Sequence, residues 1–136
     1  MQNPPPVQDG KSSTGLDENI AALLSYVFGW ISGLIFFLME KSSRLVRFHA
    51  MQSILFNVGA AVVAIVLGIV ISILVLILGQ VSGALAGIAS ILSFLFWLVF
   101  GLAILGVWVL CLIKAYNRQM YKLPFIGDMA EKFANK

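Results

Sequence analysis

The chain has 136 residues, of which 60% are hydrophobic and 11% are charged, whereas a typical globular protein is about 25% charged. So few charges cannot cover the surface of a soluble domain of this size, which excludes an ordinary soluble fold. The net charge of +3 does not indicate nucleic-acid binding, because the basic residues flank apolar segments and form no basic stripe.

The first segment, residues 1–13, is rich in Pro, Gln, Ser and Gly and has no apolar periodicity. Such a composition is typical of a disordered tail. The segment lacks a basic region before a short apolar stretch, so it is not expected to be a signal peptide. Residues 14–136 are then expected to form one transmembrane domain.

The first helix is expected to begin near Thr14, whose hydroxyl would cap the first turn. Asp17 and Glu18 suit the positive end of the helix dipole. The apolar stretch over residues 20–39 would be about 30 Å long as one helix, which matches the hydrocarbon core of a bilayer. We therefore predict a first membrane span there.

Two further spans are predicted over residues 51–78 and 85–113, because residues 51–113 contain no Lys, Arg, Asp or Glu. The turn between them is expected at residues 79–83, the only cluster of glycine and polar residues in this stretch. The predicted fold class is an all-α integral membrane protein with three transmembrane helices.

Residues 114–136 are expected to form a tail after the third span. In this tail Asp128 followed by Glu131 resembles a capping box, which would open a short helix. Met129 and Phe133 would share one face of that helix. We expect it to lie on the membrane surface as a short interfacial helix.

The distribution of Lys and Arg predicts the orientation. With three spans, one side of the membrane carries only Lys11, and the other side carries the remaining eight basic residues. The N-terminus is then expected outside, and the C-terminus in the cytoplasm.

One polar group stands out at the start of the second span. Its members have helical spacing and share one side of the helix: His49, Gln52, Ser53 and Asn57. Polar groups in hydrocarbon need partners, so they predict either hydrogen bonds between helices or a polar vestibule that contacts a substrate or partner. Arg44 and Arg47 precede them and are interpreted as topology anchors and lipid headgroup ligands, or as contacts for a partner protein.

Small residues recur at four-residue spacing in all three predicted spans, and such patterns allow helices to pack closely. They predict either packing of the chain's own helices or self-association. The residues are Gly29, Gly33, Ala60, Ala64, Gly68, Gly83 and Gly87.

The sequence shows no pattern typical of catalysis, such as an intramembrane carboxylate, paired acids or a nucleophile next to a base. No cofactor or metal site is expected, because no second His, Cys or acidic residue stands near His49 at ligand spacing. We therefore predict that the protein is not an enzyme.

Four short stretches stand out in the sequence, namely Leu16–Asn19, Glu40–Arg44, Arg47–Ser53 and Tyr121–Asp128. In this order they resemble the small bacterial membrane proteins of the Tic-twenty-like family, which is similar to a chloroplast inner-envelope protein-import component. The resemblance covers residues 14–131.

This resemblance implies a non-enzymatic component related to protein translocation or membrane assembly, in a bacterial cytoplasmic membrane. The expected partners are the lipid bilayer and either a membrane protein or further copies of the chain. Two alternatives stay open, namely an oligomeric channel or small-solute transporter subunit, and an immunity protein against a membrane-active peptide.

Overall fold

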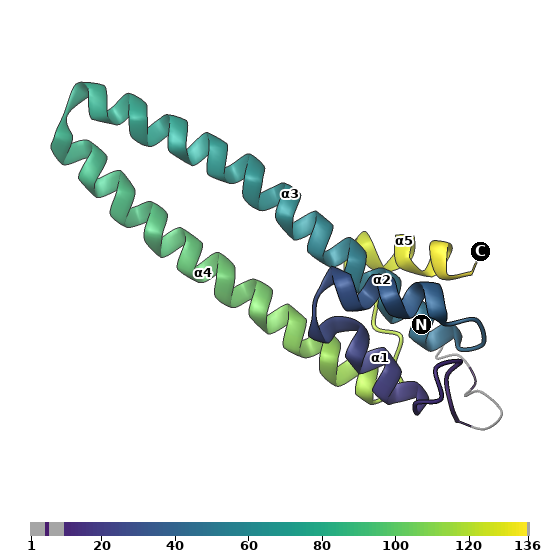
Figure 1. Cartoon of the computed structure of the whole chain (residues 1–136). Coiled ribbons are helices and arrows are strands. Elements are labelled where there is room, and N and C mark those ends of the chain that lie inside the picture. Colours follow the sequence, from purple (N-terminus) through teal and green to yellow (C-terminus); the bar gives the residue numbers. More distant parts are fainter. Residues whose placement is uncertain (1–4, 6–9, 136) are drawn as a thin grey trace. The chain divides into compact units, whose positions relative to one another are not determined.

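The computed structural model describes residue 5 and residues 10–135, and the elements found there are five α-helices (Figure 1). The predicted all-α class is therefore confirmed. The helices are α1 (Glu18–Val27), α2 (Trp30–Met39), α3 (Arg44–Val81), α4 (Gly83–Tyr116) and α5 (Ile126–Ala134).

The chain divides into two compact units. One unit, here called the terminal unit, contains residues 1–58 and 108–136 and so joins both ends of the sequence. The other, here called the hairpin unit, contains residues 59–107. The long helices α3 and α4 each contribute to both units.

The hairpin unit consists of two antiparallel helical segments joined at Ser82 (Figure 1). The half-buried positions recur every three or four residues on each helix, which places them along one seam between the two helices. On α3 these positions include Ala60, Ala64, Ile71, Val75 and Leu78, and on α4 they include Ala86, Ala89, Ser93, Trp97 and Phe100.

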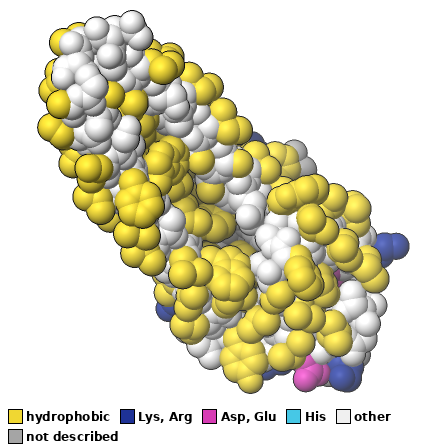
Figure 2. Space-filling model, turned by 60° about the vertical axis from the view of Figure 1, so that its left-hand side comes forward, with side chains coloured by type: hydrophobic (Ala, Val, Ile, Leu, Met, Phe, Trp, Pro, Cys, Tyr) yellow, Lys and Arg dark blue, Asp and Glu magenta, His cyan; other side chains and the backbone are white. Residues whose placement is uncertain are grey.

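Outside this seam the hairpin unit exposes large apolar side chains and carries no charge (Figure 2). Residues 59–81 and 83–107 would each measure roughly 35 Å, close to the thickness of a hydrocarbon core. The helices α3 and α4 are both long and apolar enough to cross a membrane. The two later predicted helices and the turn between them are thus found, with longer helices than expected.

The first predicted span is not one helix, and this prediction was wrong. Residues 20–39 form α1 and α2, which pack against each other. The chain reverses at Phe28 and Gly29, and Gly29 has a φ of 62°, which favours glycine. Each helix has ten residues and is about 15 Å long, half of a hydrocarbon core.

Because of this reversal, the segment before α1 lies next to the residue that follows α2. The Ser13 amide donates to both carboxylate oxygens of Glu40, at 3.1 and 3.0 Å. Residues 10–13, expected in a disordered tail, are therefore ordered, and the rest of that prediction, apart from residue 5, lies outside the described residues. The helix begins at Glu18 and not at Thr14, whose side chain instead bonds with Ser12.

The C-terminal helix α5 is present but begins differently from the prediction. Its N-cap is Phe125, which has a φ of 63° and makes no capping bond through its side chain. The predicted capping box of Asp128 and Glu131 is therefore absent. Both carboxylates are used in ion pairs instead.

Candidate functional site

The polar side chains at the start of α3 form a buried network with α1. The ring atom Nδ1 of His49 lies 2.8 Å from the Tyr26 hydroxyl, and the Gln52 amide donates to the same hydroxyl at 3.1 Å. All three side chains are fully buried. They connect the first turns of α3 to the last turn of α1.

The same network holds the segment that follows α4. His49 Nε2 lies 2.8 Å from the Gln119 carbonyl oxygen, which can only accept, so Nε2 carries the proton and Nδ1 accepts from Tyr26. The Gln52 side chain donates to the Tyr121 carbonyl at 2.9 Å and accepts from the Leu123 amide at 3.1 Å. The Gln52 side chain thus satisfies two backbone groups of a segment that forms no helix.

Ser53 and Asn57 lie one and two turns further along α3. The Ser53 hydroxyl donates to the Gly29 carbonyl at 3.0 Å, and the Asn57 amide donates to the Ser53 carbonyl at 2.8 Å. Ser53 is fully buried and Asn57 is half-buried. These two residues therefore face the reversal between α1 and α2.

His49, Gln52 and Ser53 hydrogen-bond with segments outside α3, whereas the Asn57 amide bonds within α3. Among the described residues, every buried side-chain nitrogen and oxygen has a hydrogen-bond partner. In this conformation His49, Gln52 and Ser53 do not line an open vestibule, because burial closes them off from solvent. Their role is to hold the terminal unit together.

The two arginines of the predicted patch also bond within the terminal unit. Arg47 donates to the carbonyls of Glu40 at 2.9 Å and Ala134 at 3.1 Å, and its guanidinium lies 4.4 Å from the centre of the Phe37 ring. Arg44 is more exposed and pairs with Glu131 of α5 at 3.2 Å. They connect α3 with the loop after α2 and with α5.

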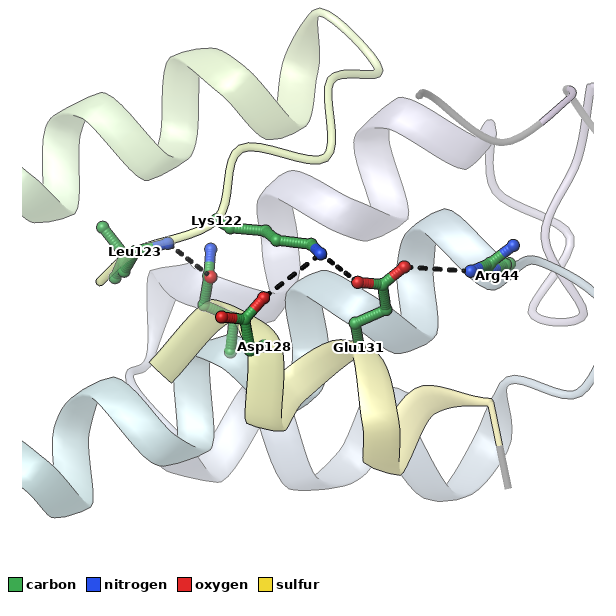
Figure 3. A network of polar contacts seen from close by, with 6 residues as sticks. Arg44, Lys122, Leu123, Asp128 and Glu131 are labelled. Carbon is green, nitrogen blue, oxygen red and sulfur yellow. Dashed lines mark hydrogen bonds and ion pairs between the residues drawn. The ribbon is translucent and has the colours of Figure 1, made fainter. Parts of the chain in front are cut away.

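An ionic cluster lies along one edge of α5, where two of its carboxylates point toward Lys122 and Arg44 (Figure 3). Lys122 lies between Asp128 and Glu131 and pairs with both, and Glu131 also pairs with Arg44. The hydrogen bond with Glu131, followed by that with Asp128, raises the pKa of Lys122. The cluster links α5 by charge to Lys122 and Arg44, and Gly127, Ala130 and Ala134 of the same helix are buried.

Sequence reasoning missed a second buried polar site, centred on Glu40. Its carboxylate accepts hydrogen bonds from Ser13, Ser42 and Ser43, at distances between 2.7 and 3.1 Å. Burial alone would raise the pKa of Glu40, but these hydrogen bonds outweigh it, so the pKa lies below its usual value. A cluster of serines around one acidic residue was the available signal.

Of the glycines predicted to pack, some contact other residues of the chain and others have open space around them. A Cβ on Gly33 would lie 2.8 Å from the Ala50 carbonyl oxygen, so α2 and α3 touch there, and Gly29 lies against Asn57. Gly68 faces Trp97 across the hairpin seam, where Ala60 and Ala64 are half-buried. Gly83 and Gly87 have open space around them and so take no part in packing within the chain.

A groove in the hairpin unit is mostly apolar. It is lined by Ile71, Ser72, Val75, Leu76, Ser90, Ser93 and Trp97. The hydroxyls of Ser90 and Ser93 donate to carbonyls one turn back on their own helix. Across the described part of the chain, no three His, Cys, Asp or Glu residues gather in a way that could hold a metal ion.

These features define an all-helical protein with two apolar helices of membrane-spanning length and a terminal unit held by buried polar bonds. The chain belongs to the magnetosome magnetite crystal formation protein family, whose model matches residues 16–130. It is also similar to a UPF0132 membrane protein of Methanocaldococcus jannaschii, with 38% identity over 92% of this chain and 96% of the relative. A UPF0132 membrane protein of Archaeoglobus fulgidus is 38% identical over 86% of this chain and 95% of the relative.

No solved structure matches the chain. The family match and the archaeal relatives correct the resemblance to the Tic-twenty-like family, which was wrong. The relatives are named as membrane proteins, so membrane localisation stands.

Proposed function

We propose that this chain is a non-enzymatic protein of the cytoplasmic membrane that crosses the bilayer twice. The two crossings are residues 59–81 of α3 and residues 83–107 of α4. The terminal unit, with both ends of the chain, then lies on the cytoplasmic side. The function of the two crossings is to anchor the terminal unit at the membrane surface.

The observation that carries this proposal is the contact between Ser13 and Glu40. These residues precede α1 and follow α2, and a helix crossing the bilayer between them would put them on opposite faces. Their hydrogen bonds instead support a common side for the N-terminal segment and the loop after α2. This replaces the predicted arrangement with the N-terminus outside.

Charge supports the same arrangement. The turn between α3 and α4 contains no Lys or Arg, and all nine basic residues of the chain lie in the sequence before or after the two crossings. With two crossings these nine residues share one side, which the positive-inside rule identifies as cytoplasmic. The three-span prediction left Lys11 on the opposite side, so the new arrangement is the more asymmetric one.

The non-enzymatic role is supported by how the reactive side chains are used. Both ring nitrogens of His49 are engaged inside the terminal unit. The carboxylates of Glu40, Asp128 and Glu131 accept bonds from neighbouring residues. A general base needs access to a substrate, and these groups are committed to the fold.

The family description names magnetite crystal formation. For this chain we propose a role in organising a membrane and not in binding mineral ions. Among the described residues, the acidic side chains pair with Lys11, Lys122 and Arg44 or accept hydrogen bonds from serines. Loss of the gene should then alter the composition or shape of the membrane that holds the protein before it alters ion uptake.

Topology is tested by cysteine labelling in intact cells, in a Cys111→Ala background that removes the native thiol. We expect Ser82→Cys to react with an impermeant maleimide from outside. Lys11→Cys and Lys41→Cys should react only after the membrane is permeabilised. Labelling of Lys11→Cys from outside would restore the three-span arrangement and contradict the proposal.

Self-association through α4 is a second candidate, supported by the open space around Gly83 and Gly87. Small residues allow close approach of a helix from another copy, and an oligomer is what a channel or transporter subunit would need. The mass of the protein in native-like lipid nanodiscs tests this. We expect Gly87→Leu to convert an oligomer to a monomer, whereas a wild-type monomer would rule this candidate out.

A further inference from the structure

We infer that the hairpin formed by α1 and α2 dips into the cytoplasmic leaflet of the bilayer and returns, with lipid as its ligand. This inference rests on the proposed two crossings by α3 and α4. The part that enters lipid is the reversal at residues 27–31, here called the tip. The bilayer would thus contact the chain at a third place in addition to the two crossings.

The tip exposes apolar side chains that a water-facing loop would not carry. Phe28 is 76% exposed, Trp30 is 52% exposed and Ile31 is 50% exposed. The exposed apolar surface continues along α2 through Ile35 and Leu38, and residues 19–39 contain no charged side chain. An apolar patch of this kind marks a surface that is covered by lipid or protein.

The backbone of the tip indicates that the cover is lipid. A helix break in water leaves its free amides and carbonyls to the solvent, but a break in hydrocarbon must satisfy them within the protein. At the tip Trp108 donates to the Tyr26 carbonyl at 2.8 Å, and Ser53 donates to the Gly29 carbonyl at 3.0 Å.

Ser32 adds further hydrogen bonds to this backbone from the first turn of α2. Its hydroxyl oxygen accepts from the Phe28 amide at 3.1 Å, and the hydroxyl lies 3.1 Å from the Ser25 carbonyl oxygen, to which it can donate. Side chains of α2, α3 and α4 thus form hydrogen bonds with the backbone of one short reversal. An exposed turn in water would need none of them.

The positions along α3 and α4 that the tip contacts also agree with insertion of the tip into lipid. The tip contacts α3 at Ser53 and Asn57 and α4 at Trp108. Along α3 the buried residues end at Phe56, and beyond residue 58 its side chains are exposed or half-buried. The tip therefore contacts α3 and α4 within two turns, along each helix, of residues 59 and 107, which bound the proposed crossings. From there, α1 and α2 return about 15 Å to the charged end of the terminal unit.

Spin labels in vesicles of phosphatidylcholine and phosphatidylglycerol test this inference. One label is placed at the tip by Phe28→Cys, one in the crossing by Val66→Cys and one in the N-terminal segment by Lys11→Cys, all with Cys111→Ala. We expect about tenfold fewer collisions with a water-soluble nickel chelate at the Phe28 label than at the Lys11 label, because hydrocarbon excludes a polar chelate. Collisions with oxygen, which concentrates in lipid, should be higher at the Phe28 label.

The outcomes distinguish lipid, water and protein as the environment of the tip. If the Phe28 label meets the chelate as often as the Lys11 label while the Val66 label is shielded, the tip lies in water; the inference fails and the two crossings stand. If both chelate and oxygen are excluded from the Phe28 label, a protein covers the tip and the inference also fails. If the Val66 label meets the chelate, the proposed crossings themselves fail. Ile31→Cys repeats the measurement should Phe28→Cys unfold the chain.

Discussion

Helix α3 is one continuous helix with two different surroundings. Residues 44–58 contain all eight of its buried residues, which pack against α1, α2 and the C-terminal segment. Residues 59–81 contain no buried residue, although they are the more apolar part. Hydropathy therefore reports that a side chain avoids water, but not whether protein or lipid takes the place of water.

The polar residues distinguish the two parts better than hydropathy does. The first part carries His49, Gln52, Ser53 and Asn57, and all four bond with other residues. The second part has only Ser72 and Gln80 as polar side chains. A polar stripe on an apolar helix thus predicts packing against protein, because lipid cannot satisfy it.

The sharpest test of this comparison uses two glycines in similar sequence patterns. Gly33→Ala in the terminal unit would push a methyl group against the Ala50 carbonyl oxygen, whereas Gly87→Ala in the hairpin unit meets open space. We expect Gly33→Ala to cost about 3 kcal/mol of unfolding free energy and Gly87→Ala to change little. Thermal unfolding in lipid nanodiscs measures both, and equal effects would contradict the two-surroundings view.

A second test removes a buried amide. Gln52→Leu leaves the Tyr121 carbonyl and the Leu123 amide without partners, and each unsatisfied buried group costs about 1–3 kcal/mol. Ser93→Ala is the control in the hairpin unit, because its hydroxyl bonds only with a carbonyl of its own helix. Faster proteolysis after α4 is expected for Gln52→Leu alone. Unchanged proteolysis would mean that the C-terminal segment is held without Gln52.

The Glu40 site predicts a pH dependence of the terminal unit. Its pKa in the folded state lies below the ordinary 4.5, so the stabilisation is fully present above pH 4.5 and is lost as pH falls through the folded-state pKa. Glu40→Gln should lower the free energy of unfolding at pH 7 by about 1.5–3 kcal/mol and flatten its acid dependence. Unfolding midpoints between pH 3 and 7 measure this, and parallel curves for the two proteins would exclude Glu40 as the titrating group.

The smallest effect is expected at the exposed edge of α5. Arg44→Ala removes the ion pair with Glu131, which is half-exposed on the arginine side, and such pairs contribute about 0.2–1 kcal/mol. Arg47→Ala is the comparison, because the Arg47 guanidinium is half-buried and bonds with backbone carbonyls at both ends of the unit. Thermal midpoints should fall clearly more for Arg47→Ala, and the reverse order would contradict the assigned contacts.

The sequence was sufficient to predict the helical class, the two long apolar helices and the turn at residues 79–83. Uncharged apolar length is a property of composition and needs no knowledge of contacts. The polar face of α3 was also visible from spacing alone. These features are local, and local patterns are what a single sequence reports best.

The reversal at Gly29 could not be predicted in the same way. Gly29 and Gly33 have the spacing of a packing motif, and Gly33 does pack, but the positive φ of Gly29 depends on partners far away in sequence, Ser53 and Trp108 among them. The bonds from Gln52 to the C-terminal segment are likewise long-range. Such contacts leave no trace in the periodicity of either segment.

The four stretches that suggested a plastid import family all belong to the terminal unit. There they bond with one another, as Gln52 does with Leu123 and Ser43 with Glu18. The family comparisons assign the chain elsewhere. The four stretches thus lie in one unit, while the family that they suggested was wrong.

Because the terminal unit joins both ends of the sequence, it also sets an order of events during synthesis. The carbonyl that His49 bonds lies 70 positions later in the chain, which corresponds to a delay of about 4–14 seconds at ~5–20 residues per second. The hairpin unit is synthesised within that interval, so its two helices are present while His49 and Gln52 still lack their C-terminal partners. Residues 119–123 then close the unit by bonding with His49 and Gln52.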